Sequence, residues 1–132
     1  MFPVKYIGML LLLLCIHTLR AQDAGKDSTA AVTLLKEAKS FFFTDKQAML
    51  DKAAEGLKVA ERINNKTLQG NFNNIMGVAY TYLVKFELAN KSLIKARDLA
   101  IAINDKVLLS KAYTNLGLNY MQWGKQLPAI NE

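Results

Sequence analysis

The sequence predicts an all-α fold, an α-α superhelix of stacked antiparallel helix hairpins. Two observations predict it. The stretch at residues 68–83 returns forty positions later at 108–123, so that Gly77 aligns with Gly117. In both copies the apolar residues recur at three- and four-residue steps, which is typical of an amphipathic helix. Matches at one fixed offset across more than one helix indicate an array of structural repeats.

The first 21 residues predict a secretory signal peptide, which takes no part in the fold. Lys5 supplies the positive charge, an apolar run occupies 7–16, and Ala21-Gln22 is a plausible cleavage point. The run of ten apolar residues is shorter than the about 20 that a membrane-spanning helix requires. We therefore expect an exported protein, periplasmic or secreted. Membrane contact is expected only transiently through this leader, or through a downstream segment that this chain does not contain.

A bacterial lipoprotein signal is a second interpretation of the leader, because Cys15 follows Leu12-Leu13-Leu14. Leu14 stands where that signal requires glycine or alanine. The sequence therefore favours a cysteine in an apolar leader over a lipidated one.

After the leader, the small polar residues 22–27 predict a flexible segment before a repeat domain at 28–132. Ser28 or Thr29 can cap a first helix, which ends in three phenylalanines at 41–43. The buried stripe of this helix is expected from Val32, Leu35, Ala38 and Phe42.

The second helix follows a turn at Thr44 and Asp45, which can cap it. Asn64-Asn65 end this helix, because asparagine tolerates the left-handed backbone conformation that helix ends often adopt. Its buried stripe is expected from Met49, Ala53, Leu57, Ala60 and Ile63.

Three further helices are expected at 68–83, 88–103 and 108–123, and Asn104-Asp105 end the fourth as Asn64-Asn65 end the second. Their expected buried residues are Leu68, Phe72, Ile75, Met76, Ala79, Tyr80 and Leu83, then Leu88, Ser92, Leu93, Ala96, Leu99, Ala100 and Ile103, and then Leu108, Ala112, Tyr113, Leu116, Tyr120 and Trp123.

A turn at Gly124 is expected to lead into a sixth helix, in whose first turn Pro128 is acceptable. The repeat units then cover about 28–67, 68–107 and 108–132, the last of them incomplete. Repeat arrays need a terminal helix with a polar outer face, and the sequence contains no such helix after 108–123. We expect this chain to be a fragment of a longer protein, the alternative being an unusually short open array.

Gly77 and Gly117 lie inside predicted helices, where glycine costs about 1 kcal/mol relative to alanine. Because this cost recurs at two positions forty residues apart, we expect one structural reason for both glycines. Without a Cβ atom, each glycine lets the partner helix approach closely, and Ala89 and Ala96 on that partner serve the same purpose.

The residues that recur resemble the tetratricopeptide repeat (TPR), a helix–turn–helix unit of about 34 residues. Three departures are the forty-residue period, which implies a longer second helix, Ile101 where a proline closes the family's unit, and Glu37 where glycine is expected in the first copy. The resemblance is to the long-period repeats of bacterial envelope proteins, such as the sensory regions of sensor kinases, and implies about two and a half repeats. The structural repeat positions are Gly77, Tyr80, Ala89, Ala96, Gly117, Tyr120 and Ala129, and Met76, Leu93, Tyr113, Leu116 and the turn Trp123-Gly124-Lys125 also match.

Composition disfavours an enzyme. The single cysteine and the single histidine, Cys15 and His17, both lie in the leader. Without them the mature chain cannot form a Cys–His pair, a Ser–His–Asp triad or a histidine-based metal site. Its glycines are isolated, so no phosphate-binding loop is present. We predict a protein that is not an enzyme and uses no cofactor and no metal.

The sequence pI of about 9.5 raises the possibility of nucleic-acid binding. After the leader, however, Arg62 and Arg97 are the only arginines and the lysines are scattered. Nucleic-acid sites cluster their charge and favour arginine for bidentate contacts. We therefore expect no nucleic-acid partner.

The TPR resemblance implies that the first helix of each unit lines a concave groove that binds a protein or peptide. Asn115 stands just before Leu116-Gly117, where the family often keeps an asparagine that bonds a peptide backbone; amide side chains both donate and accept hydrogen bonds. An equally weighted interpretation is that these asparagines are solvated or bond a neighbouring helix. Tyr80, Tyr120 and Trp123 are expected in the core. The groove candidates are Asn71, Asn74, Val78, Thr81, Tyr82, Lys111, Thr114, Asn115, Leu118 and Gln122.

Two functions follow. The favoured one is an exported, non-enzymatic TPR scaffold that binds a protein or peptide in this groove. The alternative is the N-terminal sensory segment of a membrane-anchored signalling protein, such as a sensor kinase or a transcriptional regulator, whose output domain lies downstream.

Overall fold

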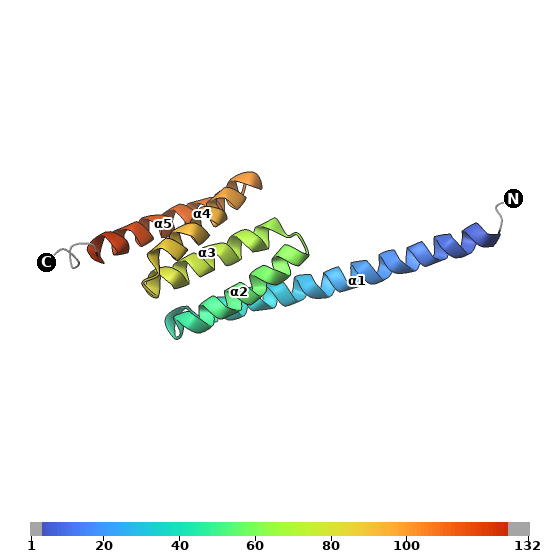
Figure 1. Cartoon of the computed structure of the whole chain (residues 1–132), viewed down its shortest axis with the longest axis horizontal. Coiled ribbons are helices and arrows are strands. Elements are labelled where there is room, and N and C mark those ends of the chain that lie inside the picture. The colour runs from blue at the N-terminus through green and yellow to red at the C-terminus, as the bar shows by residue number, and fades with distance from the viewer. Residues whose placement is uncertain (1–3, 127–132) are drawn as a thin grey trace.

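The computed structural model describes residues 4–126, and within this range the chain is helical and contains no strand. Each of the five α-helices packs against its neighbours (Figure 1). The all-α fold class is therefore confirmed. The elements are α1 (Val4–Ser40), the short 3-10 helix η1 (Phe41–Phe43), α2 (Lys46–Arg62), α3 (Lys66–Tyr82), α4 (Phe86–Ala102) and α5 (Lys106–Gln126).

Helices α2 to α5 begin at residues 46, 66, 86 and 106, so each helix with its turn occupies twenty residues. The helices α2, α3 and α4 all have 17 residues. The two helices of the middle unit therefore have equal length, so the forty-residue period is divided evenly between them. Three-residue turns reverse the chain direction at each step, as the colours in Figure 1 show.

The middle residue of each turn has a left-handed backbone conformation, with φ of 52° at Asn64, 61° at Val84 and 55° at Asn104. Asparagine adopts this conformation readily, whereas a β-branched valine is strained in it. The prediction that Asn64-Asn65 and Asn104-Asp105 end helices is confirmed.

Carboxylate or amide side chains cap three of the helices. Asp45 accepts a hydrogen bond from the backbone N–H of Ala48 at 2.9 Å, which confirms the cap predicted for α2. The caps of α3 and α5 are equivalent, with Asn65 accepting from Leu68 N–H and Asp105 from Leu108 N–H. Each cap satisfies one of the backbone donors that a helix N-terminus leaves without a partner.

Helix α3 is the centre of the fold and contacts α1, α2, α4 and α5. Its side chains are buried on several faces, and Phe72 is completely buried between α3 and α2. Burial of one such aromatic side chain removes a large apolar area from water and stabilises the fold by about 1.5–3 kcal/mol. Helix α3, which carries half of the predicted groove residues, is thus also the helix that contacts all four other α-helices.

Helix α1 differs most from the prediction. Residues 22–27, expected to be flexible, are helical, and the hydroxyl of Thr29 donates to the carbonyl oxygen of Gly25 at 3.1 Å inside the helix instead of capping it. Arg62 of α2 binds Asp27 with two hydrogen bonds of 2.9 Å. This bidentate pair, together with the burial of Ala31 against α2, fixes α1 at the residues where the sequence predicts a break.

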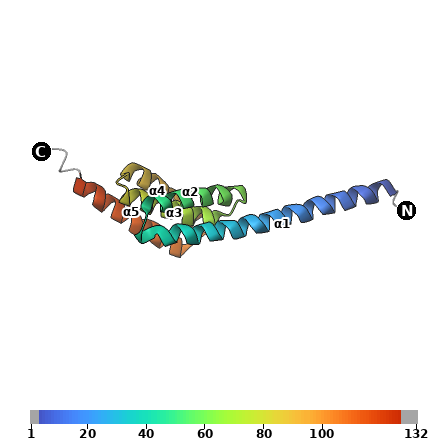
Figure 2. The same ribbon diagram turned by 90° about the horizontal axis from the view of Figure 1, so that it is seen from below.

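The first half of α1 extends away from the other helices in both views (Figures 1 and 2). Its apolar side chains between Tyr6 and Leu19 are exposed. By length and composition this part of α1 is suitable for crossing a membrane, and a signal sequence near an N-terminus has the same properties.

Several predicted core positions are exposed. Val32 is 41% exposed because α1 turns Ala31, Leu34 and Ala38 toward α2 instead. Tyr120 is 52% exposed because, within residues 4–126, no helix covers the outer face of α5. Leu88 and Tyr113 are exposed as well, whereas Trp123 stacks on Phe86 with ring centroids 6.0 Å apart.

Gly124 does not turn the chain. Helix α5 continues through it to Gln126, and a Cβ atom placed on Gly124 would meet no described atom within 4 Å. In the preceding unit Val84 makes the corresponding turn and α4 then packs back on α3. The predicted sixth helix, with Pro128 and Ala129, lies outside the described residues.

The two interior glycines have different surroundings. A Cβ atom on Gly77 would overlap Leu93 of α4 and lie 3.3 Å from the carbonyl oxygen of Ala89, so close approach of the partner helix is confirmed there. Gly117 has open space around it, and its predicted partner Ala129 is not among the described residues. Gly56, which the sequence analysis did not single out, lies against the ring of Phe72.

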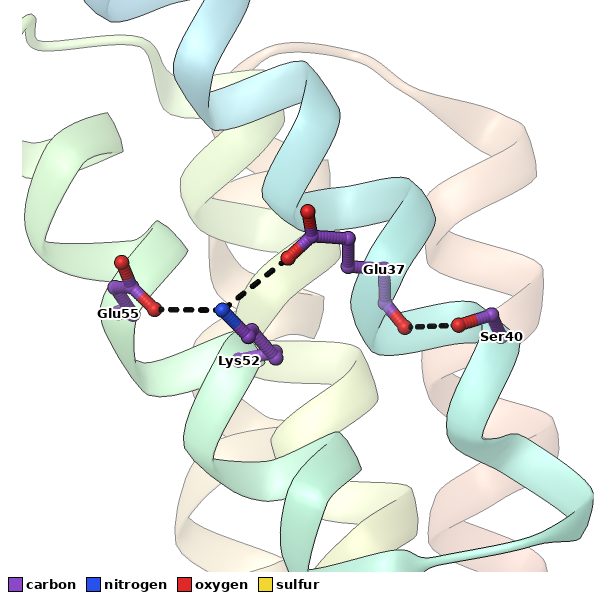
Figure 3. A network of polar contacts seen from close by, with 4 residues as sticks. All are labelled: Glu37, Ser40, Lys52 and Glu55. Carbon is purple, nitrogen blue, oxygen red and sulfur yellow. Dashed lines mark hydrogen bonds and ion pairs between the residues drawn. The ribbon is translucent and has the colours of Figure 1, made fainter.

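An ion-pair network on the surface joins α1 to α2 (Figure 3). The ammonium group of Lys52 lies 3.2 Å from a carboxylate oxygen of Glu37 and 3.3 Å from one of Glu55. Hydrogen bonds to Glu37 and Glu55, followed by their negative charges, raise the pKa of Lys52 above 10.5. Exposed pairs of this kind contribute little to stability.

A pH dependence of stability follows from this raised pKa. The folded chain holds the Lys52 proton more tightly than the unfolded chain. The contribution of this network to stability is therefore present below pH 10.5 and is lost as pH rises through the higher folded-state pKa of Lys52. We expect the unfolding temperature to fall slightly more for the wild type than for Lys52→Gln between about pH 9 and pH 11.5. Circular dichroism melts measure this, and equal falls in the two proteins would contradict the network in solution.

Candidate functional site

A groove of about 450 Å³ runs along α3 between the end of α1 and helix α5. Helices α1, α3 and α5 are the first helices of successive units, and α3 contacts both of the others. The three-residue turns place every second helix on the same side of the stack, which is how residues forty positions apart meet in one surface. The groove is lined by Lys39, Phe42, Phe43, Met49, Asn71, Asn74, Ile75, Val78, Tyr82, Lys111, Asn115 and Leu118.

Two asparagines meet on one wall of the groove. The Nδ2 group of Asn115 on α5 donates to the Oδ1 atom of Asn74 on α3 at 3.0 Å. This contact agrees with the interpretation that the asparagines bond a neighbouring helix. It leaves the Oδ1 atom of Asn115 and the Nδ2 group of Asn74 for other partners, so the pair can still offer one acceptor and one donor.

Apart from Asn71, the rest of the lining is aromatic, aliphatic or basic. Met49, Ile75 and Val78 are buried beneath the groove, and Lys39 and Lys111 are exposed at its sides. The lining contains no aspartate or glutamate, and these lysines take part in none of the ion pairs between described residues. The groove therefore favours an anionic ligand by its charge.

One end of the groove is aromatic. The ring of Phe42 meets the rings of Phe43 and Tyr82 edge to face, with centroid distances of 4.7 and 5.9 Å. The ammonium group of Lys46 lies 4.6 Å from the centroid of Phe42 and 5.0 Å from that of Tyr82. Distances of this size give a favourable interaction between a cation and aromatic faces.

The structure brings seven of the ten groove candidates together: Asn71, Asn74, Val78, Tyr82, Lys111, Asn115 and Leu118. Thr81, Thr114 and Gln122 do not line it. Thr81 is buried, and its hydroxyl oxygen lies 3.0 Å from both Gly77 O and Asn119 Oδ1. The side-chain hydroxyl of Thr114 donates a hydrogen bond to the carbonyl oxygen of Ser110 on its own helix.

The core network around Thr81 was not predicted from the sequence. Asn119 is completely buried on α5, and its Nδ2 group donates to the carbonyl oxygen of Phe86 at 3.1 Å. It therefore ties α5 to α3 and to the start of α4. A buried amide without such partners would destabilise the fold by about 1–3 kcal/mol. Because asparagine is polar, the hydrophobic pattern of the sequence does not indicate that this position lies in the core.

Five lining residues were missed, and one had a detectable signal. Phe42 aligns with Tyr82 at the repeat offset of forty, so extending the register into the first copy would have found it. Met49 and Ile75 were assigned only to the core, whereas they are also the floor of the groove. Lys39, in the last turn of α1, and Phe43, in η1, align at the offset of forty with Ala79 and Leu83, which do not line the groove.

On the opposite side of α3, Gln69 and Asn73 line a second hollow of about 370 Å³, where backbone carbonyl oxygens already accept hydrogen bonds from their amide groups. Gln69 donates to the carbonyl oxygen of Ala60 at 3.2 Å, and Asn73 donates to that of Gln69 at 2.8 Å. Both side chains are buried. The asparagines of α3 therefore divide by side: Asn71 and the largely buried Asn74 line the groove, whereas the buried Asn73 lies on the other side of the helix.

The chain was compared with models of protein families, with curated proteins and with solved structures, and no match was found. The description of the site therefore depends on its geometry and chemistry alone.

Proposed function

We propose that this chain is a non-enzymatic, exported TPR-like scaffold that binds an extended segment of a protein or peptide in the groove along α3. The observation that carries the proposal is the pair formed by Asn74 and Asn115 above an apolar floor. Its remaining donor and acceptor suit the alternating N–H and C=O groups of an extended peptide backbone. Apolar lining with a few convergent polar groups is characteristic of ligand-binding surfaces.

The repeat supports the same proposal. Helices at twenty-residue intervals, alternating between the two sides of the stack, would continue as a superhelix with α1, α3 and α5 along its inner surface. The alternative, a sensory segment of a membrane-anchored signalling protein, would use the same groove. Continuation of the coding sequence into a spanning helix and an output domain would favour that alternative over a free scaffold.

A charge placed in the groove tests the proposal. Leu118 lines the groove and is half-buried, so an arginine there would obstruct a peptide while still reaching solvent. Random decapeptides displayed on phage should be enriched by the full chain, and Leu118→Arg should weaken binding of the enriched peptides at least about tenfold, or about 1.4 kcal/mol. Binding is measured by fluorescence anisotropy with synthetic copies of those peptides.

The matched control is Leu88→Arg, which adds the same charge at an exposed leucine of α4 outside the groove. We expect it to bind like the wild type. Failure to enrich any peptide, or equal losses in Leu118→Arg and Leu88→Arg, would reject peptide binding in this groove.

A further inference from the structure

The aromatic end of the groove is built from two segments that lie forty residues apart in the sequence. Residues Phe41–Phe43 form the 3-10 helix η1, which ends α1 and places the ring of Phe43 in solvent, where it is 90% exposed. Tyr82 is the last residue of α3 and is 47% exposed. Phe42 lies between these two rings and touches both edge to face.

This arrangement leaves aromatic surface uncovered beside the groove. Isolated exposed apolar side chains are ordinary on protein surfaces, but here two exposed rings adjoin a third and line one hollow. Further aromatic rings pack favourably on such a cluster in edge-to-face or offset geometry, with about 0.5–1.5 kcal/mol beyond the area buried. The cluster can therefore accept one more ring.

Two basic side chains lie at this end of the groove. Lys46 lies over the rings of Phe42 and Tyr82, and Lys39 lines the groove nearby. Two carboxylates close to them in the sequence have other partners, since Asp45 caps α2 and Glu37 pairs with Lys52. Neither Lys39 nor Lys46 forms an ion pair within residues 4–126.

We infer that the cluster of Phe42, Phe43 and Tyr82 is a specificity subsite for an aromatic side chain of the bound peptide, with an acidic residue next to it in that peptide held by Lys39 and Lys46. The exposed rings supply the apolar contact and the two ammonium groups supply the charge complementarity. This inference depends on the proposed function, because the peptide backbone lies along the same groove.

The test compares the peptides that the full chain and the Phe43→Ala chain select from random decapeptides on phage. Phe43 is almost fully exposed, so its removal should not affect folding. The wild type should enrich peptides with an aromatic residue beside an aspartate or glutamate, and Phe43→Ala should lose the aromatic preference. The matched control is Tyr113→Ala, which removes an exposed ring of α5 outside the groove and should select as the wild type does.

Anisotropy titrations with a selected peptide then separate the two contacts. Replacing its aromatic residue by alanine should weaken binding to the wild type about tenfold and should have little effect on binding to Phe43→Ala. Replacing its acidic residue by the amide should weaken binding to the wild type more than to Lys46→Gln, and only at low salt.

Peptides enriched without an aromatic residue would overturn this inference and leave peptide binding in the groove intact. Equal effects of the alanine-substituted peptide on the wild type and on Phe43→Ala would overturn it as well. Failure to enrich any peptide would reject both the inference and the proposed function.

Discussion

The Phe72→Ala variant is expected to lose about 3–5 kcal/mol of unfolding free energy, the cost of deleting a buried aromatic ring and leaving a cavity. Phe72 is completely buried, and its ring lies directly over Gly56 of α2. The cavity would lie at the contact between α2 and α3, and α3 is also held by its contacts with α1, α4 and α5.

Urea unfolding followed by circular dichroism measures this loss. Phe43→Ala is the matched control, since it removes the same side chain at a position that is 90% exposed, and it should change the unfolding free energy by less than about 0.5 kcal/mol. If both variants unfold at the same urea concentration, α2 and α3 do not pack in solution as described.

The Gly77→Leu and Gly117→Leu variants should change stability in opposite directions. At Gly77 a new side chain would overlap Leu93, which is completely buried and cannot move aside. Overpacking of this kind costs about 1–3 kcal/mol. At Gly117 there is open space in the described structure, so leucine should act through helix propensity alone and stabilise α5 by up to about 1 kcal/mol.

Thermal melts of the two variants against the wild type give this comparison directly. Equal destabilisation would mean that a helix also packs on Gly117 in solution, as the sequence repeat predicts. An unchanged melt for Gly77→Leu would mean that the contact between α3 and α4 is absent.

Repeated features were the part of the fold that could be predicted. The offset of forty and the Asn64-Asn65 and Asn104-Asp105 pairs located the ends of α2 and α4, because capping and left-handed turn residues act locally. Gly77 predicted a close helix contact, because a glycine inside a helix lowers its stability. We expected the close approach of the partner helix to compensate for that cost.

Features that depend on tertiary contacts could not be predicted in the same way. The bidentate bond between Asp27 and Arg62 spans 35 residues, and nothing near Asp27 indicates that α1 continues through it. The burial of Asn119 is likewise set by the carbonyl oxygen of Phe86 on another helix. From hydrophobic periodicity alone, such polar residues are predicted to be exposed.

The candidate site lies between these cases. Seven of its residues could be named because they occupy equivalent faces of α3 and α5, which the repeat register determines. At the aromatic end Tyr82 was predicted and Phe42 could have been found from the register, but Phe43 could not, because its position depends on η1, which follows the end of α1.

The most direct test of the account is to locate a bound peptide on α3, whose two sides differ. The isotope-labelled chain of 14.7 kDa is small enough for residue-resolved nuclear magnetic resonance. On titration with a phage-selected peptide, we expect the amide signals of Asn71, Asn74 and Asn115 to shift and those of Gln69 and Asn73 to stay in place. Shifts centred on Gln69 and Asn73, or none at Asn74 and Asn115, would contradict peptide binding in the groove.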